Sequence, residues 1–231
     1  GTIVVNKSTV PVGSTLLVEQ ALGRSDIPVV SNPEFLREGS AVDDFLHPDR
    51  VVIGSDDDAA ARRVASLYVD CGAPIMVTDP ASAETCKYAA NAFLATKLSF
   101  TNAIAAVCEA VGADANDVLL GMGYDHRIGH EFLRPGPGWG GSCFPKDSRA
   151  IISIAEDAGY DFALMRGVIQ ANDEQFDRIV RKVESVTSLD GGTVGVLGIA
   201  FKAGTDDTRE SPAIEVMKRL LAKGAMVKAY D

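Results

Sequence analysis

A glycine-rich segment that ends in a cysteine is the stretch of this sequence best suited to covalent chemistry. It reads G-W-G-G-S-C-F-P-K-D over residues 138–147, so Cys143 is followed within four residues by Lys146 and Asp147. Because a thiolate needs a nearby positive charge to form at neutral pH, this setting indicates a nucleophile or an anion-binding loop. A small buried cysteine in a turn is the alternative. A loop so rich in glycine is costly in chain entropy, which favours a site over a plain connector.

Three polar residues, Glu84, Lys87 and Asn91, are spaced three and four positions apart. On a helix this spacing places them on one face, so Lys87 and Asn91 can reach one ligand together. A solvated helix face with an ordinary Glu–Lys pair would show the same spacing. The apolar stripes that flank these residues favour a partly buried site.

Two further polar segments follow predicted strands. N-P-E-F-L-R-E-G at 32–39 offers Glu34 and Glu38 as general acid–base groups. K-S-T-V-P-V-G-S-T at 7–15 offers hydroxyls for a phosphate, a ribose or a nicotinamide amide. Ligands of open α/β sheets bind at the carboxyl ends of strands, where both segments are expected. An exposed turn and a simple helix cap are the alternatives.

A fifth segment joins a predicted strand to a predicted helix through an unusually charged loop. It reads G-I-A-F-K at 198–202 and T-D-D-T-R-E-S-P at 205–212. A solvated connector is the alternative.

The elements that must position these segments alternate between strand and helix in the first third of the chain. The β-branched run at 2–5 is typical of a buried parallel strand, which is predicted near 2–6. The other predicted strands are near 28–31, 50–54 and 74–77, and the predicted helices are near 14–22 and 58–69. This alternation predicts an α/β domain with a mainly parallel sheet.

A long helix is predicted next, with start signals at Asp79, Pro80 and Ser82 and an end before Gly112. One apolar stripe along it comprises Cys86, Ala90, Phe93, Phe100, Ile104, Val107 and Val111. A second stripe comprises Leu94, Leu98, Ala105 and Cys108. More than one face therefore requires burial, which predicts a central spine at a subunit interface.

The rest of the chain is predicted to be helical and then to return to α/β structure. Helices are predicted near 116–121, 147–158 and 162–186, and strands near 193–198 and 227–230, with Ser211 and Pro212 as a helix-start pair. The predicted fold is α/β, with Rossmann-like parallel sheets at both ends joined by a long central helix and a helical middle domain. We expect domains at 1–80, 81–190 and 191–231.

Composition narrows the classes of function. The chain has 231 residues, 46% hydrophobic and 23% charged, with a net charge of −10 and no basic cluster, so nucleic acid is not an expected partner. Its uninterrupted apolar runs are far shorter than the roughly 20 residues of a membrane helix. Cys71, Cys86, Cys108 and Cys143 match no metal or disulfide spacing, which predicts reduced thiols, no metal and a cytoplasmic location.

Five segments in this order resemble the UDP-glucose/GDP-mannose dehydrogenase family, and the resemblance covers essentially the whole chain. The signals are S-T-V-P-V-G at 8–13, N-P-E-F-L-R-E-G at 32–39, K-Y-A-A-N-A-F-L-A-T-K at 87–97, G-G-S-C-F-P-K-D at 140–147 and F-K-x-G-T-D-D-T-R-E-S-P at 201–212. Each alone is weak, but together they are specific.

The resemblance implies two Rossmann-like domains joined by a long helix, the first binding NAD and the second a nucleotide sugar. The chain is expected to be a fragment cut at both ends, beginning after the family's first βαβ unit with its G-x-G-x-x-G fingerprint. We expect the fragment alone to be inactive and to bind NAD weakly or not at all. A homodimer or higher homo-oligomer through the central helix is also expected.

The implied reaction is oxidation of the primary alcohol of UDP-glucose to the carboxylate of UDP-glucuronate, with two hydride transfers to two NAD+. A cysteine holds the aldehyde as a thiohemiacetal, which becomes a thioester that water hydrolyses.

Carried over position by position, the resemblance implies a role for each matching residue. The catalytic set comprises the nucleophile Cys143, the oxyanion-stabilising Lys87 with its neighbouring donor Asn91, the carboxylate Asp147 acting with an ordered water, the acid–base residue Glu34, and Thr9. The NAD-binding set comprises Ser8, Thr9, Glu38, Cys143, Lys146 and Arg209. The substrate-binding set comprises Glu34, Phe35, Leu36, Glu38, Lys87, Asn91, Arg127, Arg134, Gly138, Trp139, Gly140, Phe201 and Lys202. Arg127 is expected to serve the neighbouring subunit's site.

Alternatives stay open. Relatives that oxidise GDP-mannose or UDP-N-acetylmannosamine share the architecture, so the substrate depends on pocket detail. A two-electron 3-hydroxy acid dehydrogenase would share the helical spine without needing Cys143. A non-catalytic folded or dimerising module is the remaining alternative.

Overall fold

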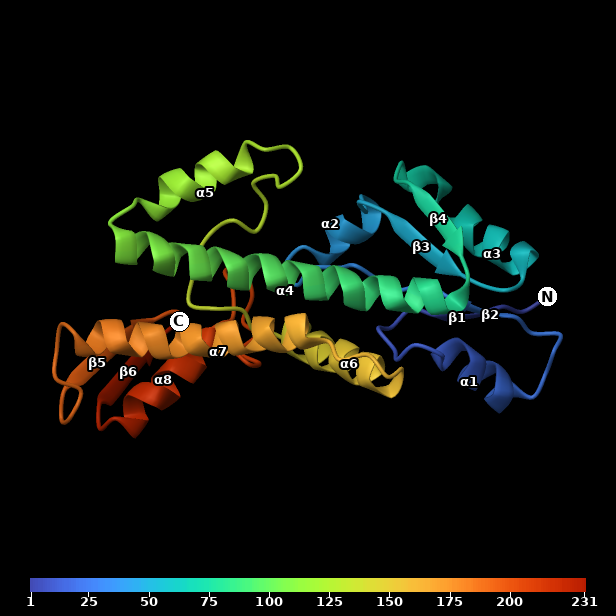
Figure 1. Cartoon of the computed structure of the whole chain (residues 1–231). Helices are drawn as coiled ribbons and strands as arrows, with labels where there is room; N and C mark the ends of the chain where they lie inside the picture. Colours follow the sequence, from blue (N-terminus) through green and yellow to red (C-terminus); the bar gives the residue numbers. More distant parts are fainter. The chain divides into compact units, whose positions relative to one another are not determined.

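A computed structural model describes residues 1–231 and divides into two compact units, Gly1–Ala90 and Asn91–Asp231 (Figure 1).

The first unit contains a four-stranded sheet in the order β1-β2-β3-β4. The strands are β1 (Val4–Asn6), β2 (Val29–Ser31), β3 (Val51–Gly54) and β4 (Ile75–Thr78). The outer pairs are parallel, as predicted, whereas β2 and β3 meet antiparallel through the single pair Ser31 and Gly54. Each strand lies within two residues of its predicted position, because short β-branched runs between turn signals mark strands clearly.

The helices of this unit are α1 (Ser14–Leu22), α2 (Ala41–Leu46), α3 (Asp58–Ala65) and the 3₁₀ turn η1 (Ser66–Cys71). Helix α1 packs on β2, and α3 packs on β2, β3 and β4. The predicted helix 58–69 is therefore α-helical only to Ala65 and tightens into η1. Helix α2 was missed because six residues are too few for a periodic apolar pattern.

Strand β1 differs from the prediction of a buried strand, because Val5 is 37% exposed. β1 lies at the edge of the sheet with only β2 beside it. The fully buried strands are β2 and β3, which have a neighbour on each side.

The long helix predicted after Asp79 is α4 (Pro80–Val111), which belongs to both units. Asp79 accepts the Ser82 N–H at 2.8 Å and so caps the helix start, and Gly112 follows its end with φ 76°. By length and composition α4 could cross a membrane, which counting uninterrupted apolar residues did not reveal. Core helices of other proteins meet the same criterion, so this is only a weak indication.

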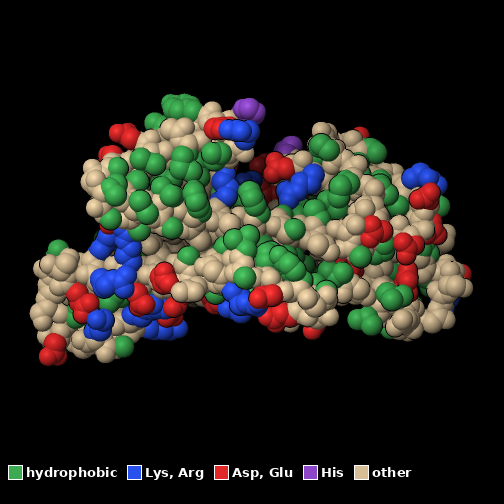
Figure 2. All heavy atoms as spheres, in the orientation of Figure 1, with side chains coloured by type: hydrophobic (Ala, Val, Ile, Leu, Met, Phe, Trp, Pro, Cys, Tyr) green, Lys and Arg blue, Asp and Glu red, His purple; other side chains and the backbone are tan.

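One of the two apolar stripes on α4 is not buried as predicted. Phe93, Phe100, Val107 and Val111 are 65, 51, 55 and 71% exposed. The second stripe is partly or fully buried, with Cys108 4% exposed. Figure 2 shows hydrophobic side chains gathered on the surface around α5 and the adjoining end of α4.

The second unit continues with α5 (Ala115–Gly123), α6 (Phe144–Asp157), α7 (Ala163–Glu184), β5 (Thr193–Leu197), α8 (Pro212–Ala222) and β6 (Met226–Tyr230). All six elements were predicted, with bounds within three residues of the observed ones, and β5 pairs parallel with β6. Helices α7 and α8 enclose a core with Phe176, Val180 and Leu220. A second core surrounds Trp139 beside α4, α6 and α7.

Candidate active site

Cys143 lies at the N-terminus of α6 and is exposed. The predicted helix began at residue 147, but α6 begins at Phe144, because Pro145 is tolerated in a first helical turn, where an N–H has no partner. The Cys143 carbonyl accepts the Asp147 N–H at 2.9 Å. Cys143 therefore lies at the end of a helix that favours negative charge.

Asp147 is 0% exposed and is held from two sides. Asn91 Nδ2 of α4 donates to its Oδ2 at 2.6 Å, and Lys146 Nζ forms an ion pair with its Oδ1. Next to it, Ser148 Oγ is buried without a hydrogen-bond partner. Asn91, Asp147, Lys146 and Cys143 thus form one cluster in the second unit.

The glycines before Cys143 are required by neighbouring protein atoms, and not only by a ligand as the sequence suggested. A Cβ on Gly140 would lie 1.9 Å from the Glu210 carbonyl oxygen, and one on Gly141 2.8 Å from the Phe201 ring. Gly141 N–H also donates to the Arg209 carbonyl at 3.1 Å. The cysteine segment therefore packs directly on the charged 198–212 loop.

That charged loop carries three predicted site residues. Arg209 forms a forked ion pair with Asp207, and the Phe201 N–H bonds the Asp207 carbonyl at 3.0 Å. Lys202 Nζ lies 5.6 Å from the Phe201 ring centre. Phe201 therefore lies beside the cysteine segment.

Lys87 lies in the first unit and is paired with Glu34, not with Glu84 as in the alternative that the helix spacing left open. It is 4% exposed, and its Nζ lies 3.8 Å from Glu34 Oε1 and 5.3 Å from the Phe35 ring centre. The Arg50 guanidinium lies 3.7 Å from the same ring. The 32–39 segment and α4 thus bring together Glu34, Phe35 and Lys87.

Glu84, one helical turn before Lys87, is buried and holds the loop that precedes α1. Its carboxylate accepts the Gly13 N–H at 2.6 Å, the Thr15 N–H at 2.9 Å and the Thr15 hydroxyl at 2.7 Å. The solvated Glu–Lys pair considered for this face is therefore wrong. A buried acid that stabilises the start of a helix was not predicted, although the S-T-V-P-V-G loop beside a helix acid could have suggested it.

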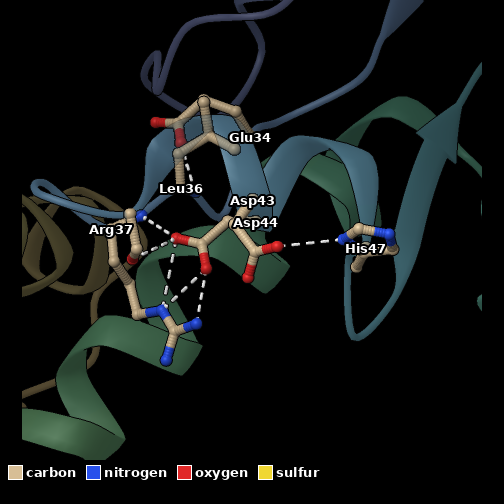
Figure 3. Close-up of polar contacts among 7 residues, drawn as sticks. Glu34, Leu36, Arg37, Asp43, Asp44 and His47 are labelled. Atoms are coloured by element: carbon tan, nitrogen blue, oxygen red, sulfur yellow. Dashed lines mark hydrogen bonds and ion pairs between the residues drawn. The ribbon is translucent and has the colours of Figure 1, made fainter.

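The 32–39 segment is ordered by carboxylates, as Figure 3 shows. Glu34 Oε2 accepts the Leu36 N–H at 2.6 Å, and Asp44 accepts the Arg37 N–H at 2.7 Å. The Arg37 guanidinium also forms a forked ion pair with Asp44, and this hydrogen bonding lowers the pKa of Asp44 to about 2. Glu38 is half-buried.

The predicted NAD contacts Ser8 and Thr9 lie in the loop after β1, where Ser8 is exposed and Thr9 half-buried. Lys7 beside them donates to Asn32 Oδ1 at 3.0 Å and to the Tyr68 hydroxyl at 3.2 Å. This network joins the carboxyl ends of β1 and β2, as expected for a ligand-binding edge.

Arg127 and Arg134 are not in the Cys143 cluster. Arg127 is exposed and paired with Asp125 at 2.5 Å. Arg134 lines an open cavity of about 920 Å³ with Leu98, Leu119 and Phe132 among its other walls. Trp139 is buried, with its indole N–H donating to Ser99 Oγ at 2.8 Å, and Gly138 packs against Asn172 and Phe176.

Comparison with protein-family models identifies the family of this chain. Residues 1–71, 81–174 and 195–231 match, in order, the NAD binding domain, the central domain and the UDP binding domain of one family. The chain belongs to the UDP-glucose/GDP-mannose dehydrogenase family.

Individual members of this family are similar over the same residues. UDP-glucose 6-dehydrogenase TuaD of Bacillus subtilis is 51% identical over 99% of this chain and 51% of its own length. A UDP-glucose dehydrogenase structure from Pyrobaculum islandicum is 44% identical, covers 98% of this chain and 54% of that chain, and has a TM-score of 0.94. A UDP-D-ManNAc dehydrogenase structure from Pyrococcus horikoshii is 27% identical, with coverages of 99% and 56% and a TM-score of 0.85.

The chain therefore spans about half the length of the UDP-glucose/GDP-mannose dehydrogenase family members that it matches. The predicted α/β fold with parallel sheets and a long central helix is confirmed by the match to the Pyrobaculum structure. The family resemblance read from the five motifs is confirmed as well.

Proposed function

We propose that the full-length protein oxidises UDP-glucose to UDP-glucuronate in two NAD-dependent steps, with Cys143 as nucleophile. The observation that carries this proposal is Cys143 at the start of α6, four residues before a fully buried Asp147 that Asn91 and Lys146 hold in place. UDP-glucose is proposed as the substrate because several curated relatives 44–51% identical carry the name UDP-glucose 6-dehydrogenase.

NAD fits the residues at the carboxyl end of β1, where the exposed Ser8 and half-buried Thr9 offer hydroxyls to a nicotinamide or ribose. Glu38, Lys146 and Arg209 are the other proposed contacts. When bound, NAD+ would accept one hydride in each of the two oxidations.

In the proposed mechanism, Cys143 Sγ forms a bond to the aldehyde carbon that the first oxidation leaves. Lys87 and Asn91 stabilise the oxygen that becomes negative, and Glu34 or Asp147 receives the alcohol proton. After the second hydride has left the thiohemiacetal, water attacks the thioester carbon. The carbon–sulfur bond breaks, the acid is released and the thiol of Cys143 is restored.

Substrate contacts are proposed for the remaining predicted residues. They comprise Phe35, Leu36, Arg127, Arg134, Gly138, Trp139, Gly140, Phe201 and Lys202. Of these, Phe201 lies beside the cysteine segment in the second unit, and Phe35 lies beside Lys87 in the first unit.

The deciding measurement is the number of NADH formed per UDP-glucose by the full-length protein. We expect two for the parent enzyme, and a stalled aldehyde-level species or a sharply slowed second half for Cys143→Ser. The matched control is Cys71→Ser, a half-buried thiol on η1. One NADH per sugar, or an unaffected Cys143→Ser enzyme, would contradict the four-electron mechanism.

GDP-mannose and UDP-N-acetylmannosamine are the alternative substrates. Measuring kcat/KM for these two sugars and for UDP-glucose with one enzyme preparation shows which of the three is preferred. No turnover of any of them by the full-length protein would instead favour a non-catalytic module.

We further propose that the protein self-associates through α4, because Phe93, Phe100 and Val107 recur every seven residues on an exposed helix face. Its four cysteines are all free thiols, which supports a reducing, cytoplasmic compartment.

A further inference from the structure

Side-chain amides of α4 and α7 bond the backbone of the glycine loop that precedes Cys143. Asn172 Oδ1 accepts the Trp139 N–H at 2.8 Å, and Asn172 Nδ2 donates to the Trp139 carbonyl at 3.0 Å. Gln175 Nε2 donates to the Gly136 carbonyl at 2.7 Å, and Asn102 Oδ1 accepts the Gly136 N–H at 2.8 Å. The side-chain amides thus satisfy backbone N–H and carbonyl groups of the loop, as the backbone of a paired β-strand would.

The pairing of Asn172 with Trp139 is buried and uses both ends of the amide. Asn172 and Trp139 are each 6% exposed, so neither backbone group of Trp139 can turn to water instead. Asparagine is unfavourable inside a helix, and its presence on α7 is explained by this reciprocal bond. No other side chain could replace it without losing the donor or the acceptor at that reach.

Packing reinforces these bonds. A Cβ on Gly138 would lie 2.7 Å from the Phe176 ring and 2.9 Å from Asn172 Oδ1, so the loop backbone lies directly on α7. The Trp139 indole bonds Ser99, whose hydroxyl donates to the Val168 carbonyl at 3.0 Å. We call the bonds from Asn172 and Gln175 to the loop backbone the Asn172 clamp. Without this clamp, a segment so rich in glycine would lose much of its order.

We propose that Asn172 and Gln175 are positioning residues that hold the Gly136–Gly141 segment in the shape that binds the nucleotide sugar and aims Cys143. This inference rests on the proposed function for its substrate, and on the bonds above for its geometry. Neither residue is assigned to touch the reacting atoms. Their effect is exerted through the loop backbone.

The test uses two pairs of variants in the full-length protein. Asn172→Asp keeps the shape and the acceptor but sets a carboxylate oxygen against the Trp139 carbonyl, and Gln175→Ala removes the second amide. The matched control is Gln170 on the same helix, an exposed amide that bonds Glu174 and not the loop. Gln170→Glu and Gln170→Ala therefore make the same chemical changes away from the loop.

We expect KM for UDP-glucose to rise about tenfold at pH 8 in Asn172→Asp and several-fold in Gln175→Ala. In Asn172→Asp, KM should return toward the parent value as the pH falls to 5.5, since the introduced carboxyl group, once protonated, can again donate to the carbonyl. Amide hydrogen exchange over residues 136–141 should accelerate roughly tenfold in both variants. The Gln170 variants should change none of these readouts.

Equal KM and equal exchange in Asn172→Asp, Gln175→Ala and the Gln170 controls would overturn the inference. A KM defect in Asn172→Asp that does not ease at low pH would overturn the role of the lost donor. If Asn172→Asp fails to fold, Gln175→Ala decides by itself. If the parent does not oxidise UDP-glucose, the proposed function fails, while hydrogen exchange still decides whether the clamp exists.

Discussion

Asn91 Nδ2 donates to Asp147 Oδ2 over 2.6 Å, which joins α4 to the first turn of α6 across 56 positions of sequence. The bond fixes a fully buried carboxylate four residues after the exposed thiol of Cys143. It also ties that carboxylate to the helix that carries Lys87 one turn before Asn91. The position of the Asp147 carboxylate is therefore set by two helices, α4 and α6.

Replacing Asn91 should damage both stability and rate. Asn91→Ala leaves Asp147 buried with one partner fewer, which costs about 1–3 kcal/mol of unfolding free energy. Because the carboxylate is then free to turn, we expect kcat to fall roughly 10²-fold or more. Urea unfolding and steady-state kinetics of the full-length protein measure both effects. Asn116→Ala on the exposed side of α5 is the control. Equal unfolding free energies and equal kcat values for the two variants would refute the prediction.

Glu84 should matter more for stability than any exposed acid. In Glu84→Ala the N–H groups of Gly13 and Thr15 lose their acceptor, and so does the buried Thr15 hydroxyl. We expect a loss of about 2–4 kcal/mol, with Glu84→Gln intermediate because one acceptor oxygen remains. Asp56→Asn, an exposed acid, should stay within about 0.5 kcal/mol of the parent. Similar unfolding curves for Glu84→Ala and Asp56→Asn would be inconsistent with this role.

Replacing a glycine by alanine should be harmful at Gly140 and beneficial at Gly167. Gly140→Ala forces a Cβ to within 1.9 Å of the Glu210 carbonyl, so the cysteine segment must move and activity should be nearly abolished. Gly167 lies inside α7, where an added Cβ would meet nothing within 4 Å, and Gly167→Ala should raise stability by about 0.5–1 kcal/mol. NADH assays test the loss of activity in Gly140→Ala, and thermal unfolding tests the gain of stability in Gly167→Ala. An active Gly140→Ala enzyme would show that the loop has room to shift.

Stability should fall in acid partly through Asp44. Its folded pKa of about 2 lies below the ordinary 3.8, so the Arg37 pair contributes fully above about pH 4. That contribution is lost as the pH falls from about 4 toward 2. It is worth at most about 2 kcal/mol, and less in salt because Arg37 is largely exposed. Asp44→Asn should remove this part of the difference in unfolding free energy between pH 6 and pH 3. Asp56→Asn, at an exposed acid in the loop after β3, should leave the difference unchanged.

The exposed stripe on α4 should control self-association. Phe93→Asp with Phe100→Asp places two charges where large apolar side chains are 65 and 51% exposed. We expect the full-length protein to dissociate, as measured by light scattering after size-exclusion chromatography. Leu67→Asp, at a residue 77% exposed on η1, is the control and should not change the mass. An unchanged mass in the double variant would place the interface elsewhere.

Local sequence patterns were sufficient to locate the helices and strands and to indicate the family. Periodic apolar positions and turn residues located the strands and all but the shortest helix, because both signals are local. The order of the five motifs indicated the family, and Cys143 with Lys146 and Asp147 indicated a nucleophile or an anion-binding loop, because those residues lie within five positions of one another in the chain.

The hydrogen-bond and packing partners of the buried polar side chains became known only from the folded chain. Spacing on one helix left open a Glu84–Lys87 pair, whereas Glu84 holds Gly13 and Thr15, and Lys87 lies beside Glu34. The Asn172 clamp on Trp139 and the contact of Gly140 with Glu210 were likewise invisible. These contacts join residues 33 to 71 positions apart, and local sequence patterns carry no information about which distant segments pack together.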